Sequence, residues 1–278
     1  MKASNFAVRT VAGAVFGIVM VGSLLLDKVL FGAVFMAIML FGMQEFFKAS
    51  APDSMHLQKR LALLTAAAAF MLVYCHCAYG IDTRWFVLLF VPLISIPVSC
   101  IFGKDHSRYG DLASIYSALL YISLPVSLTP CIAFRGGCFD GTLLLSFFII
   151  IWVSDVGAYC VGTLLGQKPD SLKLAPSISP KKSWWGFSGA VVLGTAAAVV
   201  LNLVGWLPFA MGHSIACGII ISVAAVAGDL VESLWKRHWG IKDSGNCIPG
   251  HGGMLDRFDS SLVAIPLVSA YLAAFALI

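Results

Sequence analysis

The sequence predicts an all-α, polytopic membrane protein with about nine transmembrane helices. Of its 278 residues, 59% are apolar and 12% are charged, whereas soluble domains contain about 45–50% apolar and 25% charged residues. The mean hydropathy of +0.91 points the same way. Because the chain is rich in residues that pack, its composition also excludes an intrinsically disordered protein.

Each predicted helix is a segment of about 20 apolar residues, the length that crosses the hydrocarbon core of a bilayer. The nine segments are residues 8–26, 29–47, 61–80, 83–102, 112–134, 142–166, 187–208, 212–233 and 260–278. The first is too long for a cleaved signal peptide, and Asp27 and Lys28 lead from it directly into the second. The longest polar stretches are residues 167–186 and 234–259, and we expect the chemistry there.

The distribution of lysine and arginine predicts the orientation, because cytoplasmic loops hold the excess of these residues. With nine spans, 15 of the 18 basic residues fall on one side of the membrane. The other side holds Lys28, Arg84 and Arg135. We therefore expect a cytoplasmic N-terminus, an external C-terminus and an active site that faces the cytoplasm.

The polar residues are concentrated in the second half of the chain. Residues 1–140 contain five predicted helices and are expected to form a scaffold with dimer contacts. Residues 141–278 contain four helices and both polar loops, and are expected to be the catalytic region. The eight cysteines mostly lie within spans, as small apolar residues do. Cys131 and Cys138 both lie near the outer end of the fifth predicted span, so a disulfide between them is an alternative to two free thiols.

Two predicted helices carry polar residues that packing alone does not explain. Asp155 lies midway along residues 142–166, and an ionisable group inside a span is costly enough to indicate a function. The alternative is a buried acid bonded to a neighbouring helix. The second set lies at the end of residues 212–233, where positions i, i+4, i+7 and i+8 share one helix face. These residues are Asp229, Ser233, Lys236 and Arg237.

The two polar loops contain groups that suit phosphates and a divalent metal. In one, glycines around a histidine allow close approach of backbone amides to phosphate oxygens; they are Gly250, His251, Gly252 and Gly253. Asp256 and Asp259 follow at i and i+3 and can hold Mg²⁺, which prefers oxygen ligands. The other loop offers hydroxyls and lysines before two tryptophans, at Ser179, Lys181, Lys182 and Ser183. This chemistry suits phosphoryl or nucleotidyl transfer to a lipid.

These motifs resemble the signature of the phosphatidate cytidylyltransferase (CDP-diacylglycerol synthase) family. The signature covers about 27 residues, and its positions here include Ser233, Lys236, Arg237, Lys242, Asp243, Pro249, His251, Gly252, Gly253, Asp256, Arg257 and Asp259. Companion motifs begin at Ser154 and at Ser179. The resemblance covers the chain from about residue 140 onward. Ser183 stands where the family more often has threonine.

The resemblance implies transfer of CMP from CTP to the phosphate of phosphatidic acid, which yields CDP-diacylglycerol and pyrophosphate. It also implies Mg²⁺ held by Asp229 and Asp256, a monovalent cation such as K⁺, and a homodimer. The expected partners are CTP, phosphatidic acid and membrane lipids, with no nucleic acid. The expected location is the bacterial inner membrane, as a multi-pass protein.

The roles expected of the remaining residues follow from the charges of the two reactants. The attacking lipid phosphate is already ionised, so the main task is to neutralise two polyanions during in-line attack. The catalytic candidates are Asp155, Lys236, Arg237, Lys242, Asp243, His251 and Asp259. The substrate-binding candidates are Ser179, Lys181, Lys182, Ser183, Ser233, Gly250, Gly252, Gly253 and Arg257. Asp155 either completes the metal shell or orients a lysine.

Two other functions compete with this interpretation. A CTP-dependent lipid kinase of the polyprenol or phytol type would transfer the γ-phosphate to an alcohol and release CDP. A secondary transporter would need only the spans and an acid within the membrane. Transporters often show repeated halves and broken helices, whereas we find no internal repeat, and the polar groups gather at one face.

Overall fold

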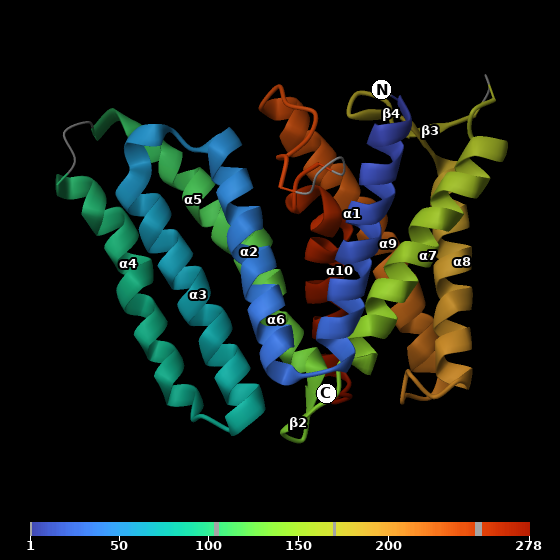
Figure 1. Cartoon of the computed structure of the whole chain (residues 1–278), viewed down its shortest axis with the longest axis horizontal. Coiled ribbons are helices and arrows are strands. Elements are labelled where there is room, and N and C mark those ends of the chain that lie inside the picture. The colour runs from blue at the N-terminus through green and yellow to red at the C-terminus, as the bar shows by residue number, and fades with distance from the viewer. Residues whose placement is uncertain (1, 103–105, 169–170, 248–251) are drawn as a thin grey trace. The chain divides into compact units, whose positions relative to one another are not determined.

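The structure is a computed structural model that describes residues 2–102, 106–168, 171–247 and 252–278, with side chains left out for residues 2–9 and 106–108. The described chain is mainly helical and has two short β-hairpins (Figure 1). It divides into two compact units. One comprises Met1–Asp140 and Asp243–Arg257, and the other comprises Gly141–Lys242 and Phe258–Ile278.

Seven helical segments of the described chain are long and apolar enough to cross a membrane, judged by length and composition. They are Lys28–Ser50, Asp53–Tyr79, Thr83–Phe102, Tyr109–Ala133, Thr142–Leu164, Trp184–Leu203 and Met211–His238. The first predicted span is shorter by this measure, over Thr10–Leu25. The predicted class, an all-α polytopic membrane protein, is confirmed; the count of nine spans stays a prediction.

The first unit contains the helices of the N-terminal half. They are α1 (Lys2–Leu25), α2 (Lys28–Ser50), η1 (Asp53–Met55), α3 (His56–Tyr79), η2 (Thr83–Leu89), α4 (Phe90–Ser99), η3 (Cys100–Phe102), η4 (His106–Asp111), α5 (Leu112–Ala118), the π-helical turn η5 (Leu119–Ser123) and α6 (Leu124–Ala133). The strands β1 (Phe134–Arg135) and β2 (Cys138–Phe139) form an antiparallel hairpin. Two of the predicted continuous spans, residues 83–102 and 112–134, are thus built from shorter helical pieces.

Local signals explain where the helices of this unit begin and end. Asp27 caps α2, because its Oδ1 accepts the amide of Val29 at 2.8 Å. Gly80 ends α3 in the left-handed region at φ 69°, a conformation that glycine adopts without strain. The two helices pack together, with Phe31 of α2 stacked on Tyr74 of α3 at a ring distance of 6.5 Å.

The cysteines of the first unit are free thiols in the structure. The thiol sulfur of Cys131 lies 3.9 Å from that of Cys77. Cys138 is exposed on β2. The disulfide between Cys131 and Cys138 that the sequence left as an alternative is therefore not formed here.

The second unit contains the remaining elements. They are α7 (Thr142–Leu164), β3 (Lys173–Ala175), β4 (Ser179–Ser183), α8 (Trp184–Leu203), α9 (Met211–His238) and most of α10 (Leu255–Ala274). The polar stretch predicted as a loop at 167–186 contains the antiparallel β3–β4 hairpin, in which Lys173 pairs with Ser183. The second predicted loop starts later than expected, because α9 continues to His238.

Glycines allow α7 and α8 to approach closely. A Cβ atom added at Gly157 would lie 2.5 Å from the carbonyl oxygen of Gly189, and one added at Gly189 would lie 2.6 Å from Cβ of Val161. Gly162 likewise faces the Cα atom of Gly186. Small residues at such positions are typical of helix pairs in membranes. This contact holds α7 beside the hairpin and α8, which together build the site described below.

Replacing Gly189 by alanine is expected to lower the melting temperature in detergent. The added methyl group would overlap backbone and side-chain atoms of α7, and overpacking of this kind costs about 1–3 kcal/mol. Gly212 of α9 is the matched control, because nothing lies within 4 Å of an added Cβ atom there. Equal melting temperatures for Gly189→Ala and Gly212→Ala would contradict the close packing of α7 on α8.

Candidate active site

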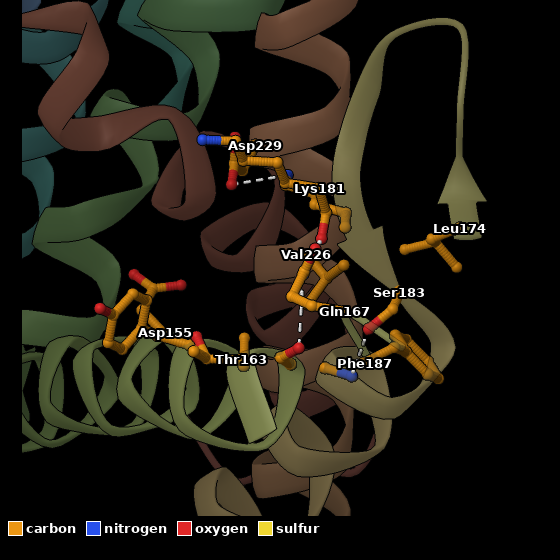
Figure 2. Close-up of a pocket in the computed structure, with 14 residues that line it drawn as sticks. Asp155, Thr163, Gln167, Leu174, Lys181, Ser183, Phe187, Val226 and Asp229 are labelled. Carbon is orange, nitrogen blue, oxygen red and sulfur yellow. Dashed lines mark hydrogen bonds and ion pairs between the residues drawn. The ribbon is translucent and has the colours of Figure 1, made fainter. Parts of the chain in front are cut away.

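A cavity of about 520 Å³ opens between elements of the second unit (Figure 2). Helix α7 contributes Asp155, Tyr159 and Thr163 to its wall. Strand β4 contributes Lys181, Lys182 and Ser183, and α9 contributes Asp229. Three segments that are far apart in the sequence therefore bring two lysines, two carboxylates and hydroxyl groups to one space.

The hairpin that carries the lysines is tied to the end of α7. Lys173 donates from Nζ to the carbonyl oxygen of Gly166 at 2.6 Å, and Gln167 donates from Nε2 to the carbonyl oxygen of Lys181 at 2.9 Å. Ser183 then caps α8, since its Oγ accepts the amide of Gly186 at 3.2 Å. These local bonds position β4 along the cavity. Ser179 pairs with Ala175 in the hairpin and is not among the residues lining the cavity.

An ion pair joins the two walls of the cavity. Nζ of Lys182 lies 2.6 Å from Oδ2 of Asp229, and Ser233 donates from Oγ to Oδ1 of the same carboxylate at 3.3 Å. The Lys182 side chain is 23% exposed and that of Asp229 is 39% exposed. Partial removal from water strengthens this attraction relative to a fully exposed pair. The pair presents both charges to any ligand that enters the cavity.

Three carboxylates interact with one another at and near this cavity. The charge of Asp155 is repelled by those of Asp229 and Asp259, and is attracted by Lys182. Asp259, on α10, also interacts with Asp229. Carboxylates placed close together favour the binding of a cation, which supplies the opposite charge. Asp155 thus lines the cavity, and its role in the reaction stays a prediction.

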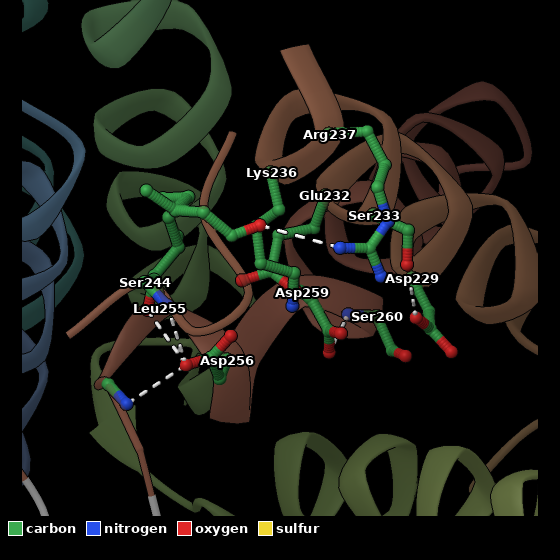
Figure 3. Close-up of polar contacts among 12 residues, drawn as sticks. Asp229, Glu232, Ser233, Lys236, Arg237, Ser244, Leu255, Asp256, Asp259 and Ser260 are labelled. Atoms are coloured by element: carbon green, nitrogen blue, oxygen red, sulfur yellow. Dashed lines mark hydrogen bonds and ion pairs between the residues drawn. The ribbon is translucent and has the colours of Figure 1, made fainter. Parts of the chain in front are cut away.

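Farther along α9, Lys236 of the predicted polar face has a partner that was not predicted, the carboxylate of Glu232. Lys236 donates from Nζ to Oε2 of Glu232 at 2.7 Å, and Glu232 is completely buried. Arg237 is exposed, and its Nη1 donates to the carbonyl oxygen of Ile241 at 3.5 Å (Figure 3). The position of Glu232, four residues before a lysine on a helix, was the available signal.

In the first unit, Asp256 is held by the loop that precedes it (Figure 3). Its Oδ2 accepts the Ser244 amide at 3.0 Å and the Gly253 amide at 2.9 Å, and lies 3.0 Å from the Ser244 hydroxyl oxygen. Gly252 has a φ of 86°, and a Cβ atom there would lie 3.0 Å from the same oxygen. The carboxylate is therefore fixed by short hydrogen bonds within its own loop.

The structure gives one predicted phosphate-binding group, the Gly253 amide, another role. The Gly253 amide was expected to hold a phosphate oxygen, but it donates to Asp256. Gly250 and His251 lie outside the described residues. Lys242, Asp243 and Arg257 have exposed side chains. Glu45 of α2 was not among the predicted site residues, although it is an acid inside a predicted span and the rule applied to Asp155 marks it equally.

The donor chemistry near the cavity fits a magnesium ion. No group of three or more His, Cys, Asp and Glu side chains that could hold a metal occurs among the described residues. Mg²⁺ does not need such a group, because it usually binds one or two carboxylates and completes its shell with water and substrate phosphates. Asp229, Asp155 and Asp259 supply carboxylate oxygens of this kind within the second unit.

Comparison with known proteins extends the resemblance to nearly the whole chain. The model of the cytidylyltransferase family matches residues 7–275, so the N-terminal half is included. The phosphatidate cytidylyltransferase of Bacillus subtilis is 37% identical over 191 residues, which cover 68% of this chain and 67% of that protein.

Two further relatives bear the same name. That of Staphylococcus haemolyticus is 42% identical over 62% of this chain and 63% of its own length. That of Haemophilus influenzae is 35% identical over 67% of this chain and 65% of its own length. The aligned segments thus span slightly less than two thirds of these two relatives.

Proposed function

The chain belongs to the cytidylyltransferase family, and we propose that it is a phosphatidate cytidylyltransferase that makes CDP-diacylglycerol. A phosphate oxygen of phosphatidic acid attacks the α-phosphorus of CTP. The bond between the α- and β-phosphates breaks, and pyrophosphate leaves with the bonding electrons. The observation that carries the proposal is the cavity with paired Lys182 and Asp229 in a unit built from apolar helices.

The residues of the cavity suit this reaction because both reactants are polyanions. Lys181 and Lys182 present positive charge to phosphate oxygens, and Asp229 holds Lys182 in place. The lipid phosphate is ionised near neutral pH, so no general base is required at the reacting oxygen. Positioning and charge neutralisation then account for the rate enhancement.

A bound Mg²⁺ ion would supply further positive charge to the phosphoryl oxygens. By resemblance to the family, the proposed ligands are Asp229 and Asp256, and a monovalent cation such as K⁺ is the proposed second ion. Asp155 and Asp259 add carboxylate charge within the second unit. Lys236, Arg237 and Lys242 are proposed to bind the triphosphate and the leaving pyrophosphate.

The protein is proposed to lie in the bacterial inner membrane. It is a multi-pass membrane protein, and its bacterial relatives support the inner membrane. The excess of lysine and arginine around residues 167–186 and 234–259 supports a cytoplasmic active site. A homodimer is proposed from the family resemblance.

Two labelled forms of CTP test the reaction. Purified protein in detergent, given phosphatidic acid and Mg²⁺, is expected to move label from [α-³²P]CTP into lipid and label from [γ-³²P]CTP into pyrophosphate. Transfer of the γ-label to a supplied lipid alcohol, with release of CDP, would instead identify a lipid kinase. Absence of lipid labelling from [α-³²P]CTP, in protein that shows a normal melting transition, would overturn the proposed function.

A further inference from the structure

A buried carboxylate of the N-terminal half is bonded to the loop that carries Asp256. Glu45 lies on α2, within a predicted span, and is only 5% exposed. Its Oε2 accepts the amide of Leu255 at 2.9 Å and the hydroxyl of Ser244 at 3.1 Å. These two bonds connect α2 with residues 199 and 210 positions farther along the chain.

The bond to Leu255 satisfies an amide that α10 itself cannot satisfy. Leu255 is the first residue of α10, and the first four amides of a helix have no partner within it. Glu45 therefore caps α10 from another helix, and a carboxylate also interacts favourably with the positive end of the helix dipole. Asp256 is the next residue along α10, so its backbone is fixed by this cap.

The bond to Ser244 connects Glu45 with the Asp256 carboxylate directly. The Ser244 hydroxyl oxygen lies 3.1 Å from Oε2 of Glu45 and 3.0 Å from Oδ2 of Asp256. Ser244 is itself buried. A single hydroxyl thus stands between the two acids, while the Ser244 and Gly253 amides hold Asp256 from the loop.

Two glycines of the loop allow this close approach. A Cβ atom at Gly253 would lie 2.5 Å from Oε2 of Glu45, and one at Gly245 would lie 2.6 Å from its carboxyl carbon. Any larger residue at either position would push the loop away from α2. These glycines are therefore needed to enclose the Glu45 carboxylate, a role that differs from the phosphate binding predicted for Gly253.

We propose that Glu45 is a positioning residue for Asp256, which it acts on through Leu255 and Ser244. Burial of a carboxylate is costly unless it is bonded, and among the described residues Oε1 of Glu45 has no hydrogen-bond partner. An apolar side chain would pack at this position of α2 without that cost. The inference rests on the proposed function, because it assumes that Asp256 serves the transfer reaction.

Three variants test the proposal kinetically. Glu45→Leu removes both acceptor bonds, and kcat is expected to fall about tenfold or more while the KM for CTP changes less than about twofold. Glu45→Gln can place its amide oxygen where Oε2 lies, so it is expected to restore most of kcat. Ser244→Ala, which removes only the hydroxyl link, is expected to give an intermediate loss. The Ser244→Ala variant also tests the positioning role if Glu45→Leu does not fold.

The matched control is Ser50→Ala on the same helix. Ser50 is buried, and its hydroxyl donates only to the carbonyl oxygen of Phe46 in α2. Its kcat is expected to equal that of the wild type. Equal kcat for Glu45→Leu and the wild type, or equal losses for Glu45→Leu and Glu45→Gln, would overturn the positioning role.

Amide hydrogen exchange, measured without CTP, lipid or Mg²⁺, tests the contact independently of activity. The Leu255 amide is expected to exchange about tenfold faster or more in Glu45→Leu than in the wild type and in Glu45→Gln. The β3–β4 hairpin serves as the reference that should not change. Unchanged exchange at Leu255 would overturn the inference, whereas a wild type that makes no CDP-diacylglycerol but shows the expected exchange would overturn only the proposed function.

Discussion

The Asp256→Asn variant is expected to lose kcat by about 10²–10³-fold, with little change in melting temperature. Asparagine keeps the size of the side chain, and its amide oxygen can still accept from the Ser244 and Gly253 amides. The loop is therefore expected to stay in place, while the negative charge proposed to bind Mg²⁺ is lost. The measurement is CDP-diacylglycerol formation from labelled CTP across a Mg²⁺ titration, with the melting temperature measured in parallel.

Asp53→Asn is the control for loss of a carboxylate in the same unit. The Asp53 side chain is 99% exposed, and its distance of 3.7 Å from Nζ of Lys59 describes a surface ion pair of little energetic value. Its activity should equal that of the wild type. If Asp256→Asn keeps activity within tenfold of the wild type at every Mg²⁺ concentration, then Asp256 does not serve the reaction as proposed.

Lys182→Met is the second substitution with a large expected effect, a fall of about 10²–10³-fold in kcat/KM for CTP. Methionine preserves the length of the side chain but removes the charge that lies 2.6 Å from Asp229. The cavity then loses a phosphate-binding cation, and Asp229 loses its partner. Both changes raise the negative potential that the polyanionic substrates meet on entry.

A control lysine, and the alternative that the Lys182–Asp229 ion pair only stabilises the unit, can be tested in the same series of variants. Lys168 is an exposed lysine that does not line the cavity, so Lys168→Ala should retain full activity. If the ion pair only stabilises the unit, Lys182→Met should lose activity together with a lowered melting temperature, because Asp229 is left without its ion-pair partner. If Lys182 binds phosphate, Lys182→Met should lose activity at an unchanged melting temperature, with a raised KM for CTP.

Hydropathy predicted the helices well and the polar loops less well. The spans at residues 29–47, 142–166 and 212–233 correspond to α2, α7 and α9, because long apolar segments are signalled locally. The hairpin of β3 and β4 was not predicted. Its residues lack the alternation of apolar and polar side chains that marks a strand, and its position depends on Lys173 and Gln167 bonding to the end of α7 and to Lys181.

The sequence also indicated the residue types of the site, but it did not indicate their hydrogen-bond and ion-pair partners. Asp155, Lys182 and Asp229 were selected as charged or polar residues near or within the membrane, and the structure gathers them around one cavity. Glu232 and Glu45 were overlooked although Glu232 lies four residues before Lys236 on a helix and Glu45 is an acid inside a predicted span. Both prove to be buried acids with specific donors.

The sequence by itself determined the membrane class, the family signature and the kinds of chemical groups available for catalysis. These properties follow from composition and from residues that are near one another along the chain. Only the tertiary structure decided which charge faces which, as in the pairs of Lys182 with Asp229 and of Glu45 with Leu255. The physical reason is that a buried polar group must find a partner within about 3 Å, and helix packing brings those partners from distant parts of the chain.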